Sequence, residues 1–132
     1  NDPAKLHDSR WVHRPISNWE KISRRHDPKT TEGRIFSGLQ QLIQLRKSQA
    51  AVSGSEMQVI RTDSPHVLGF VRSHAAERIL VFANFNEEPQ SLPANLLRLY
   101  GLGYQYLDLL SHKPFESQDI KLEPFQLLCL KS

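Results

Sequence analysis

The spacing of hydrophobic residues changes near the middle of the chain, from the period of a helix to the period of a strand. In the first half, five large apolar residues recur at helical spacing and form one stripe: Ile35, Phe36, Leu39, Leu42 and Ile43. Asp27 offers an N-cap acceptor, and Pro28 suits the first helical position because it lacks an N–H. Arg46-Lys47 stands where cations favour the end of a helix dipole, and Ser53-Gly54-Ser55 then interrupts the pattern. These signals predict a helix over residues 28–52.

Residues ahead of this helix show no period that would bury them together. Residues 1–27 mix charges, prolines and two tryptophans, so we predict a loop segment there. Within it, residues 18–25 hold enough polar helix formers for one short helix, with Ser17 or Asn18 as its N-cap. Because the chain begins with Asn rather than Met, we expect it to be a piece of a longer protein.

Beyond residue 55 the apolar residues alternate with a period of two. The predicted strands cover residues 57–62, 67–72, 79–84, 90–92, 104–109, 119–122 and 125–130. They are separated by turn-forming residues: Asp63-Ser64-Pro65, Asn86–Pro89, Ser111–Pro114 and Glu123-Pro124. Residues 96–102 fit either a helical turn or a hydrophobic loop. Short strands about eight to twelve residues apart are typical of an antiparallel β-sandwich, so we predict a mainly β fold with N-terminal helices and a β-domain over residues 55–132.

Length and composition agree with one domain plus an extension. The chain has 132 residues, and a hydrophobic content of 39% is enough for a small core. It shows neither an apolar run near the roughly eighteen residues that span a bilayer nor a secretory signal, so we predict a cytoplasmic protein with no membrane partner. The single cysteine, Cys129, lies among leucines and is predicted to be a small core residue rather than a reactive thiol.

The net charge of +3 is unevenly distributed, because basic residues gather in the first quarter of the chain, among them Arg10, Arg14, Lys21, Arg24 and Arg25. With Trp11 and Trp19 among them, these residues are compatible with nucleic-acid binding. Four acidic residues interrupt the basic run, however, and no nucleic-acid-binding motif accompanies it. We therefore expect no nucleic-acid partner, and a basic face that is solvated or ion-paired.

No group of residues forms a self-contained reactive centre. His7, His13 and His26 lie near Asp8 and Asp27, but none has a partner at the spacing that metal sites favour, so we expect no metal. The Gly-x-Ser-x-Gly motif of a nucleophile elbow is absent, and the glycines near residue 102 lack the context of a phosphate loop. We therefore expect no catalytic residue and no cofactor in this chain.

Three segments carry a resemblance to a known enzyme family. The sequence NDPAKLHDSRWVHRP, residues 1–15, resembles the segment that follows the last barrel strand in amylosucrases. Residues 39–48 are similar to the final barrel helix of the α-amylase superfamily, and residues 67–88 and 122–126 resemble its C-terminal β-domain. By this resemblance, residues 1–27 follow the last barrel strand, residues 28–52 form the last helix of a truncated (β/α)₈ barrel, and residues 55–132 form the C-terminal domain.

The resemblance implies a retaining glucosyltransferase or hydrolase acting on sucrose or α-glucans. In that family an aspartate nucleophile and a glutamate acid/base stand on the barrel, upstream of the segment seen here. The chain itself would then be a non-catalytic appendage whose partner is the remainder of the barrel. The alternative is a carbohydrate-binding β-sandwich module, for which the clustered candidates are Tyr100, Tyr104 and Tyr106, with Tyr104 and Tyr106 on one face.

The resemblance also implies one substrate-pocket residue. In amylosucrases an arginine of this loop pairs with an aspartate at the floor of the glucose pocket, and the matching residue is Arg10, with Arg14 as second choice. The alternative for Arg10 is a solvated loop residue. Trp11 and Trp19 would pack against the barrel in preference to stacking on sugars. Without the barrel, part of the helical stripe should be exposed, so we predict self-association through the N-terminal segment and helix.

Overall fold

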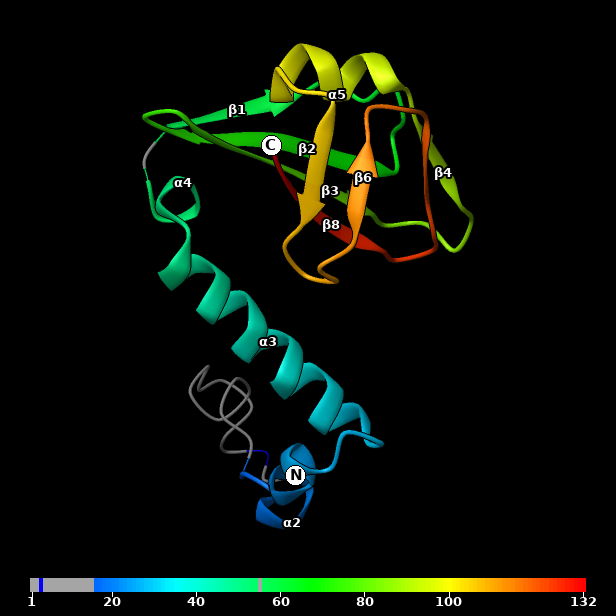
Figure 1. Cartoon of the computed structure of the whole chain (residues 1–132). Coiled ribbons are helices and arrows are strands. Elements are labelled where there is room, and N and C mark those ends of the chain that lie inside the picture. Colours follow the sequence, from blue (N-terminus) through cyan, green and yellow to red (C-terminus); the bar gives the residue numbers. More distant parts are fainter. Residues whose placement is uncertain (1–2, 4–15, 55) are drawn as a thin grey trace. The chain divides into compact units, whose positions relative to one another are not determined.

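The computed structural model describes residues 3, 16–54 and 56–132 of the chain (Figure 1). The chain divides into two compact units, Asn1–Gln40 and Gln41–Ser132. All the strands of the described residues lie in the second unit.

The first unit begins with two short helical elements, α2 (Trp19–Ser23) and η2 (Arg24–His26). Asn18 caps α2, because its side-chain oxygen accepts a hydrogen bond from the Lys21 N–H at 2.9 Å. The short helix predicted over residues 18–25 is thereby confirmed, with Asn18 as the capping residue.

Helix α3 (Thr31–Ser48) begins later than the sequence predicts. The Asp27 side chain accepts from the Lys29 N–H at 2.9 Å and so closes a turn instead of capping the helix. Thr30 takes the capping role, because its hydroxyl oxygen accepts from the Gly33 N–H at 3.0 Å. Gly33 lies so close to the Asp27 carbonyl that a side chain there would collide with it. The predicted start at residue 28 is therefore wrong.

A break at Gln49 separates α3 from a second helix, α4 (Ala50–Ser53). Gln49 has extended backbone angles, φ −114° and ψ 115°, and these end the helical path for one residue. The continuous helix predicted up to residue 52 is thus interrupted.

Eight strands form the β-domain: β1 (Glu56–Ile60), β2 (Val67–His74), β3 (Glu77–Asn84), β4 (Gln90–Leu92), β5 (Gln105–Asp108), β6 (Pro114–Glu116), β7 (Ile120–Leu122) and β8 (Leu127–Lys131). A six-stranded sheet has the order β1-β2-β3-β8-β5-β6, and β4 pairs with β7 in a separate two-stranded sheet. Every pair is antiparallel, so the predicted fold class, N-terminal helices followed by antiparallel sheets, is confirmed. All seven predicted strands are present, and β6 is an eighth that sequence analysis assigned in part to a turn.

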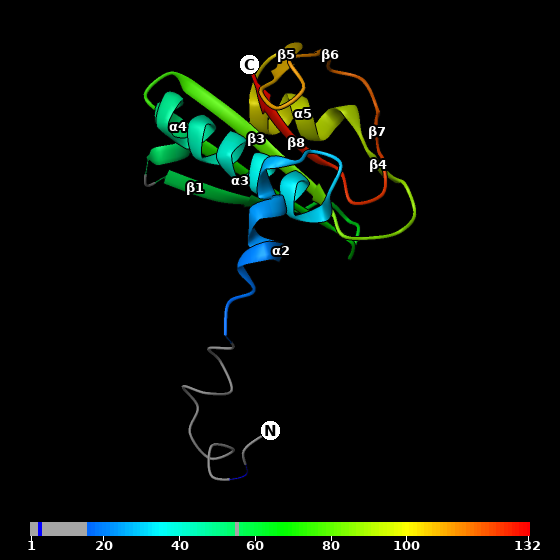
Figure 2. The same ribbon diagram turned by 90° about the horizontal axis from the view of Figure 1, so that it is seen from below.

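The core lies between the two sheets and is closed by helix α5 (Ala94–Gly101). Phe82 on β3 and Leu128 on β8 are opposite one another and buried, as are Leu80 and Leu130. Leu97 of α5 completes this cluster, together with apolar residues of β4 and β7. Residues 96–102, which fit a helical turn or a loop, therefore lie mostly in a helix. In Figure 2, α4 and the end of α3 cross in front of the six-stranded sheet and α5 lies behind it.

Candidate functional site

The two arginines that the resemblance assigns to a substrate pocket, Arg10 and Arg14, lie outside the described residues. The same holds for Trp11 and for two of the histidines considered as metal ligands, His7 and His13. Their roles stay predictions. Trp19 is described, and 75% of it is exposed.

Three basic residues in the described part of the first unit, Lys21, Arg24 and Arg25, lie near an acidic or aromatic side chain. Lys21 Nζ lies 3.8 Å from Glu32 Oε1, and Arg24 Nη2 lies 3.7 Å from Glu20 Oε1. The Arg25 guanidinium stands over the Phe36 ring at 5.9 Å. Two of these residues, Lys21 and Arg24, thus lie near carboxylates, as the ion-paired interpretation expects, whereas the absence of a nucleic-acid partner stays a prediction.

Neither a metal cluster nor a membrane span is found where the structure can be described. Within residues 16–54 and 56–132, no three His, Cys, Asp or Glu side chains come together as metal ligands would. His26 instead packs edge-on against Phe36, with ring centroids 6.1 Å apart. No helix in these ranges is both long enough and apolar enough to cross a bilayer.

The three tyrosines considered for sugar binding do not share a surface. Tyr106 is buried, and its hydroxyl donates at 2.7 Å to the Leu97 carbonyl, with the Gly103 carbonyl at 2.8 Å. Burial raises the pKa of the Tyr106 phenol. Tyr104 precedes β5 and is 74% exposed, whereas Tyr100 packs against the core. The prediction that Tyr104 and Tyr106 lie on one face is wrong, because the strand begins only after Tyr104.

Cys129 is buried, as predicted, but on the side of the six-stranded sheet opposite to the core residues Leu128 and Leu130. It is buried, and burial together with the negative charge of Asp108 raises the pKa of its thiol to about 12. Asp108 is itself buried, and its carboxylate accepts from the Cys129 N–H at 3.0 Å and from the Ser111 hydroxyl at 2.5 Å. This pair joins β5 to β8 and does not form a reactive centre.

The surface most suited to an interaction is the side of the six-stranded sheet that faces away from the core. Two rows of paired residues run across it, Phe70–Val81–Cys129 and Leu68–Ala83–Leu127. With Leu42 and Leu45 of α3 and Val52 of α4, these rows line a groove of about 450 Å³. We call this surface, with the neighbouring exposed residues Met57 and Val59 of β1, the outer sheet face. The predictions from the sequence did not include this surface.

Two aromatic residues in the loops after β3 and before β8, Phe85 and Phe125, are each 67% exposed. Phe125 stands next to the loop after β3, because its N–H donates to the Asn86 carbonyl at 3.3 Å. The buried Asn84 side chain ties the two loops together by donating to the Glu88 and Glu123 carbonyls at 2.9 and 3.0 Å. Exposed apolar residues on loops held this firmly are typical of a surface that another domain covers.

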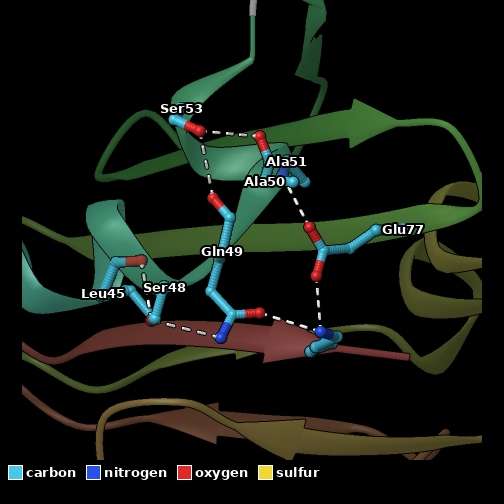
Figure 3. Close-up of polar contacts among 8 residues, drawn as sticks. Leu45, Ser48, Gln49, Ala50, Ala51, Ser53 and Glu77 are labelled. Carbon is cyan, nitrogen blue, oxygen red and sulfur yellow. Dashed lines mark hydrogen bonds and ion pairs between the residues drawn. The ribbon is translucent and has the colours of Figure 1, made fainter.

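A polar junction attaches the helical break to one end of the sheet (Figure 3). The Glu77 carboxylate accepts from the Ala51 N–H at 2.6 Å and from Lys131 Nζ at 2.5 Å. Lys131 Nζ also donates to the Gln49 side-chain oxygen at 2.9 Å. The hydrogen bond from Lys131, followed by that from Ala51, lowers the pKa of the Glu77 carboxyl.

Arg72 of β2 holds the other end of α4. Its guanidinium donates to the carbonyls of Ala51 and Val52, each at 3.3 Å, and to that of Gly54. These are carbonyls that a helix end leaves without intrahelical partners. Both ends of a four-residue helix are therefore bound by charged side chains from the sheet.

Comparison with known families gives one match over most of the β-domain. Residues 57–128 match the family described as maltogenic amylase, C-terminal domain. Oligo-1,6-glucosidase of Bacillus cereus is 30% identical over 105 residues, which cover 74% of this chain and 17% of the glucosidase. The chain thus spans about a sixth of the length of that relative.

Solved structures show the same fold. AmyP in complex with maltose has a TM-score of 0.65 at 19% identity, covering 77% of this chain and 21% of AmyP. A variant of the trehalulose synthase MutB in complex with Tris has a TM-score of 0.64 at 25% identity, covering 84% of this chain and 19% of MutB. Another MutB variant was solved in complex with the substrate sucrose. Each likeness covers about a fifth of the larger protein.

Proposed function

Because the chain belongs to the maltogenic amylase C-terminal domain family and forms the C-terminal domain of an α-amylase family (GH13) enzyme, we propose that it is a structural part of that enzyme without a catalytic group of its own. The observation that carries this proposal is the outer sheet face, which is apolar on two rows of residues and remains partly exposed in the chain. Covering such a surface stabilises a protein by removing apolar area from water. We propose that the remainder of the catalytic barrel covers it.

For the whole enzyme we propose cleavage of α-glucosidic bonds in sucrose or α-glucans. Maltose is bound by AmyP, and sucrose is named as the substrate of MutB, which supports this substrate class without choosing between the two sugars. The chemistry would be that of a retaining enzyme, in which one carboxylate forms a glucosyl intermediate and another transfers the proton. Both carboxylates would lie on the barrel, outside this chain.

A direct test compares the complete enzyme with the chain alone. We expect the complete enzyme to release reducing sugar from sucrose or maltooligosaccharides, and the chain alone to show no turnover at equal molar concentration. We also expect titration of the chain with maltoheptaose to give weak or no binding. Turnover by the chain alone would refute the structural role, and tight binding would favour the carbohydrate-binding alternative.

At the finer level we propose an amylosucrase-like glucosyltransferase, on the strength of residues 1–15 and of Arg10 within them. A guanidinium that makes two hydrogen bonds to a buried carboxylate has a large interaction energy with it, and removing the arginine leaves the carboxylate unpaired. Arg10→Ala should therefore lower kcat/KM for sucrose about a hundredfold in the complete enzyme. Arg14→Ala is the matched control and should change it less than about threefold. A larger effect of Arg14→Ala than of Arg10→Ala would contradict the assignment of Arg10 to the substrate pocket. Release of glucose as the main product, in place of glucan, would contradict the proposed transferase activity.

A further inference from the structure

Helix α4 is too short to be stable by itself, so its position depends on the sheet. A four-residue helix forms one turn, and the cost of starting a helix exceeds what one turn returns. Gln49, the residue before it, is extended and separates it from α3. The structure holds this break from the sheet side through Glu77 on β3 and Lys131 on β8.

We propose that Glu77 and Lys131 form an electrostatic latch that holds the Gln49 break against the sheet, and that neutralising the Glu77 carboxylate loosens this break and the start of α4, while Arg72 still binds the α4 carbonyls. The latch has three bonds: Glu77 to the Ala51 N–H, Glu77 to Lys131, and Lys131 to the Gln49 side chain. Two of the three bonds are accepted by the Glu77 carboxylate itself, and the third is donated by the Lys131 ammonium that this carboxylate holds in place. One proton on Glu77 therefore weakens two bonds directly and removes the restraint on the third.

The surroundings of Glu77 distinguish it from an ordinary surface ion pair. Only 19% of its side chain and 36% of that of Lys131 is exposed, whereas the exposed pair Lys121–Glu123, 3.2 Å apart, has 66% and 58%. Solvent screens the exposed pair and weakens its contribution. A carboxylate that also accepts a backbone N–H in a partly buried site contributes more.

Two charged or titratable groups act on Glu77 from the strands around it, and a third charge, that of Arg72, lies at the other end of α4. Lys131 comes from β8, and His74 comes from the end of β2 and favours the negative carboxylate when protonated. Arg72, also of β2, directs its guanidinium to the α4 carbonyls. Lysine and arginine stay charged throughout the acidic range, so Glu77 is the group of the latch that changes charge there.

The direction of the pH dependence follows from the lowered pKa of Glu77. A carboxyl whose pKa is lower in the folded than in the unfolded protein stabilises the fold above its ordinary value of 4.5. That contribution is lost as the pH falls below 4.5 and through the folded pKa. We therefore expect the latch to be closed at neutral pH and to open in acid.

The test is amide hydrogen exchange of the full chain, expressed as protection factors so that the intrinsic pH effect is removed. In Glu77→Gln at pH 7, protection of residues 50–54 should fall about tenfold or more, while the amides of β3 and β8 keep theirs. Glu123→Gln, which neutralises the exposed pair, is the matched control and should leave both regions unchanged.

A second measurement uses the unmodified chain and so does not depend on how a variant folds. Between pH 6 and pH 3.5, protection of residues 50–54 should fall before that of β3, and in Glu77→Gln this step should be absent. Lys131→Met should weaken protection of the same residues. Unchanged protection of residues 50–54 in acid, or an equal loss across the whole β-domain, would overturn the latch.

Discussion

Buried polar side chains in the β-domain join elements that are distant in sequence. Asp108 connects the end of β5 to β8, and Asn84 connects the loop after β3 to the loop before β8. Within the described part of the chain, every buried side-chain nitrogen or oxygen has a hydrogen-bond partner. Each such residue costs free energy if its partners are lost, so these side chains favour one arrangement of the loops.

Cys129 should be nearly unreactive in the folded chain. Its pKa is raised from 9.0 to about 12, which lowers the thiolate fraction at pH 8 about a thousandfold, and burial restricts access further. Labelling with a disulfide reagent at pH 8 should therefore be more than about a hundredfold slower in buffer than in concentrated urea. Equal rates in the two solutions would show that the thiol is exposed and would contradict its burial.

At the level of elements, the periodicity of apolar residues in the sequence predicts most helices and strands. The exact ends of the elements depend on which of several neighbouring residues caps or closes a turn. Alternating or continuous apolar runs bounded by turn-forming residues locate seven strands within two residues at each end, because most strands send at least one side into the core. The start of α3 was misplaced because Asp27 and Thr30 are both capping residues, and only the turn geometry selects Thr30. Strand β6 has three residues and begins with Pro114, too little for a period to show.

The candidate site was harder to predict than the fold. Residues 79–83 are apolar at every position, a pattern typical of a strand that is covered on both faces, and this signal of the outer sheet face was available in the sequence. The Glu77 latch had no such signal, since Glu77, Lys131 and Gln49 are up to 82 positions apart. Arg10 came from a resemblance, and its structural role is still a prediction.

The capping residues of α3 allow a direct comparison. Thr30→Ala removes the acceptor of the Gly33 N–H and should destabilise the start of the helix by about 1 kcal/mol, lowering protection of residues 34–37 about fivefold. Asp27→Ala removes only the turn bond to Lys29 and should lower protection less than about twofold. A larger loss of protection in Asp27→Ala than in Thr30→Ala would indicate that Asp27, and not Thr30, caps α3.

For the whole molecule, the exposed apolar residues of α3 favour association of the isolated chain. Ile35, Leu39 and Ile43 are each more than half exposed, as the sequence led us to expect of a helix taken from a barrel. In sedimentation or light scattering, the average mass should rise with concentration, and Leu39→Lys with Ile43→Lys should abolish the rise. The control variant, Gln40→Lys with Gln44→Lys, adds the same charge at exposed polar positions. In this control the average mass should still rise with concentration. A strictly monomeric chain over a wide concentration range would contradict this prediction.

The position of β8 has a consequence for the order in which the protein is made. It is the last of the eight strands in sequence, yet it lies between β3 and β5 and is the only link between the two halves of the six-stranded sheet among the described pairings. During synthesis the β1–β3 meander and the β5–β6 hairpin can each form early, but they cannot join until residues 127–131 have left the ribosome. A nascent chain that stalls before residue 127 would hold two unclosed half-sheets, each with a free edge open to pairing with another chain.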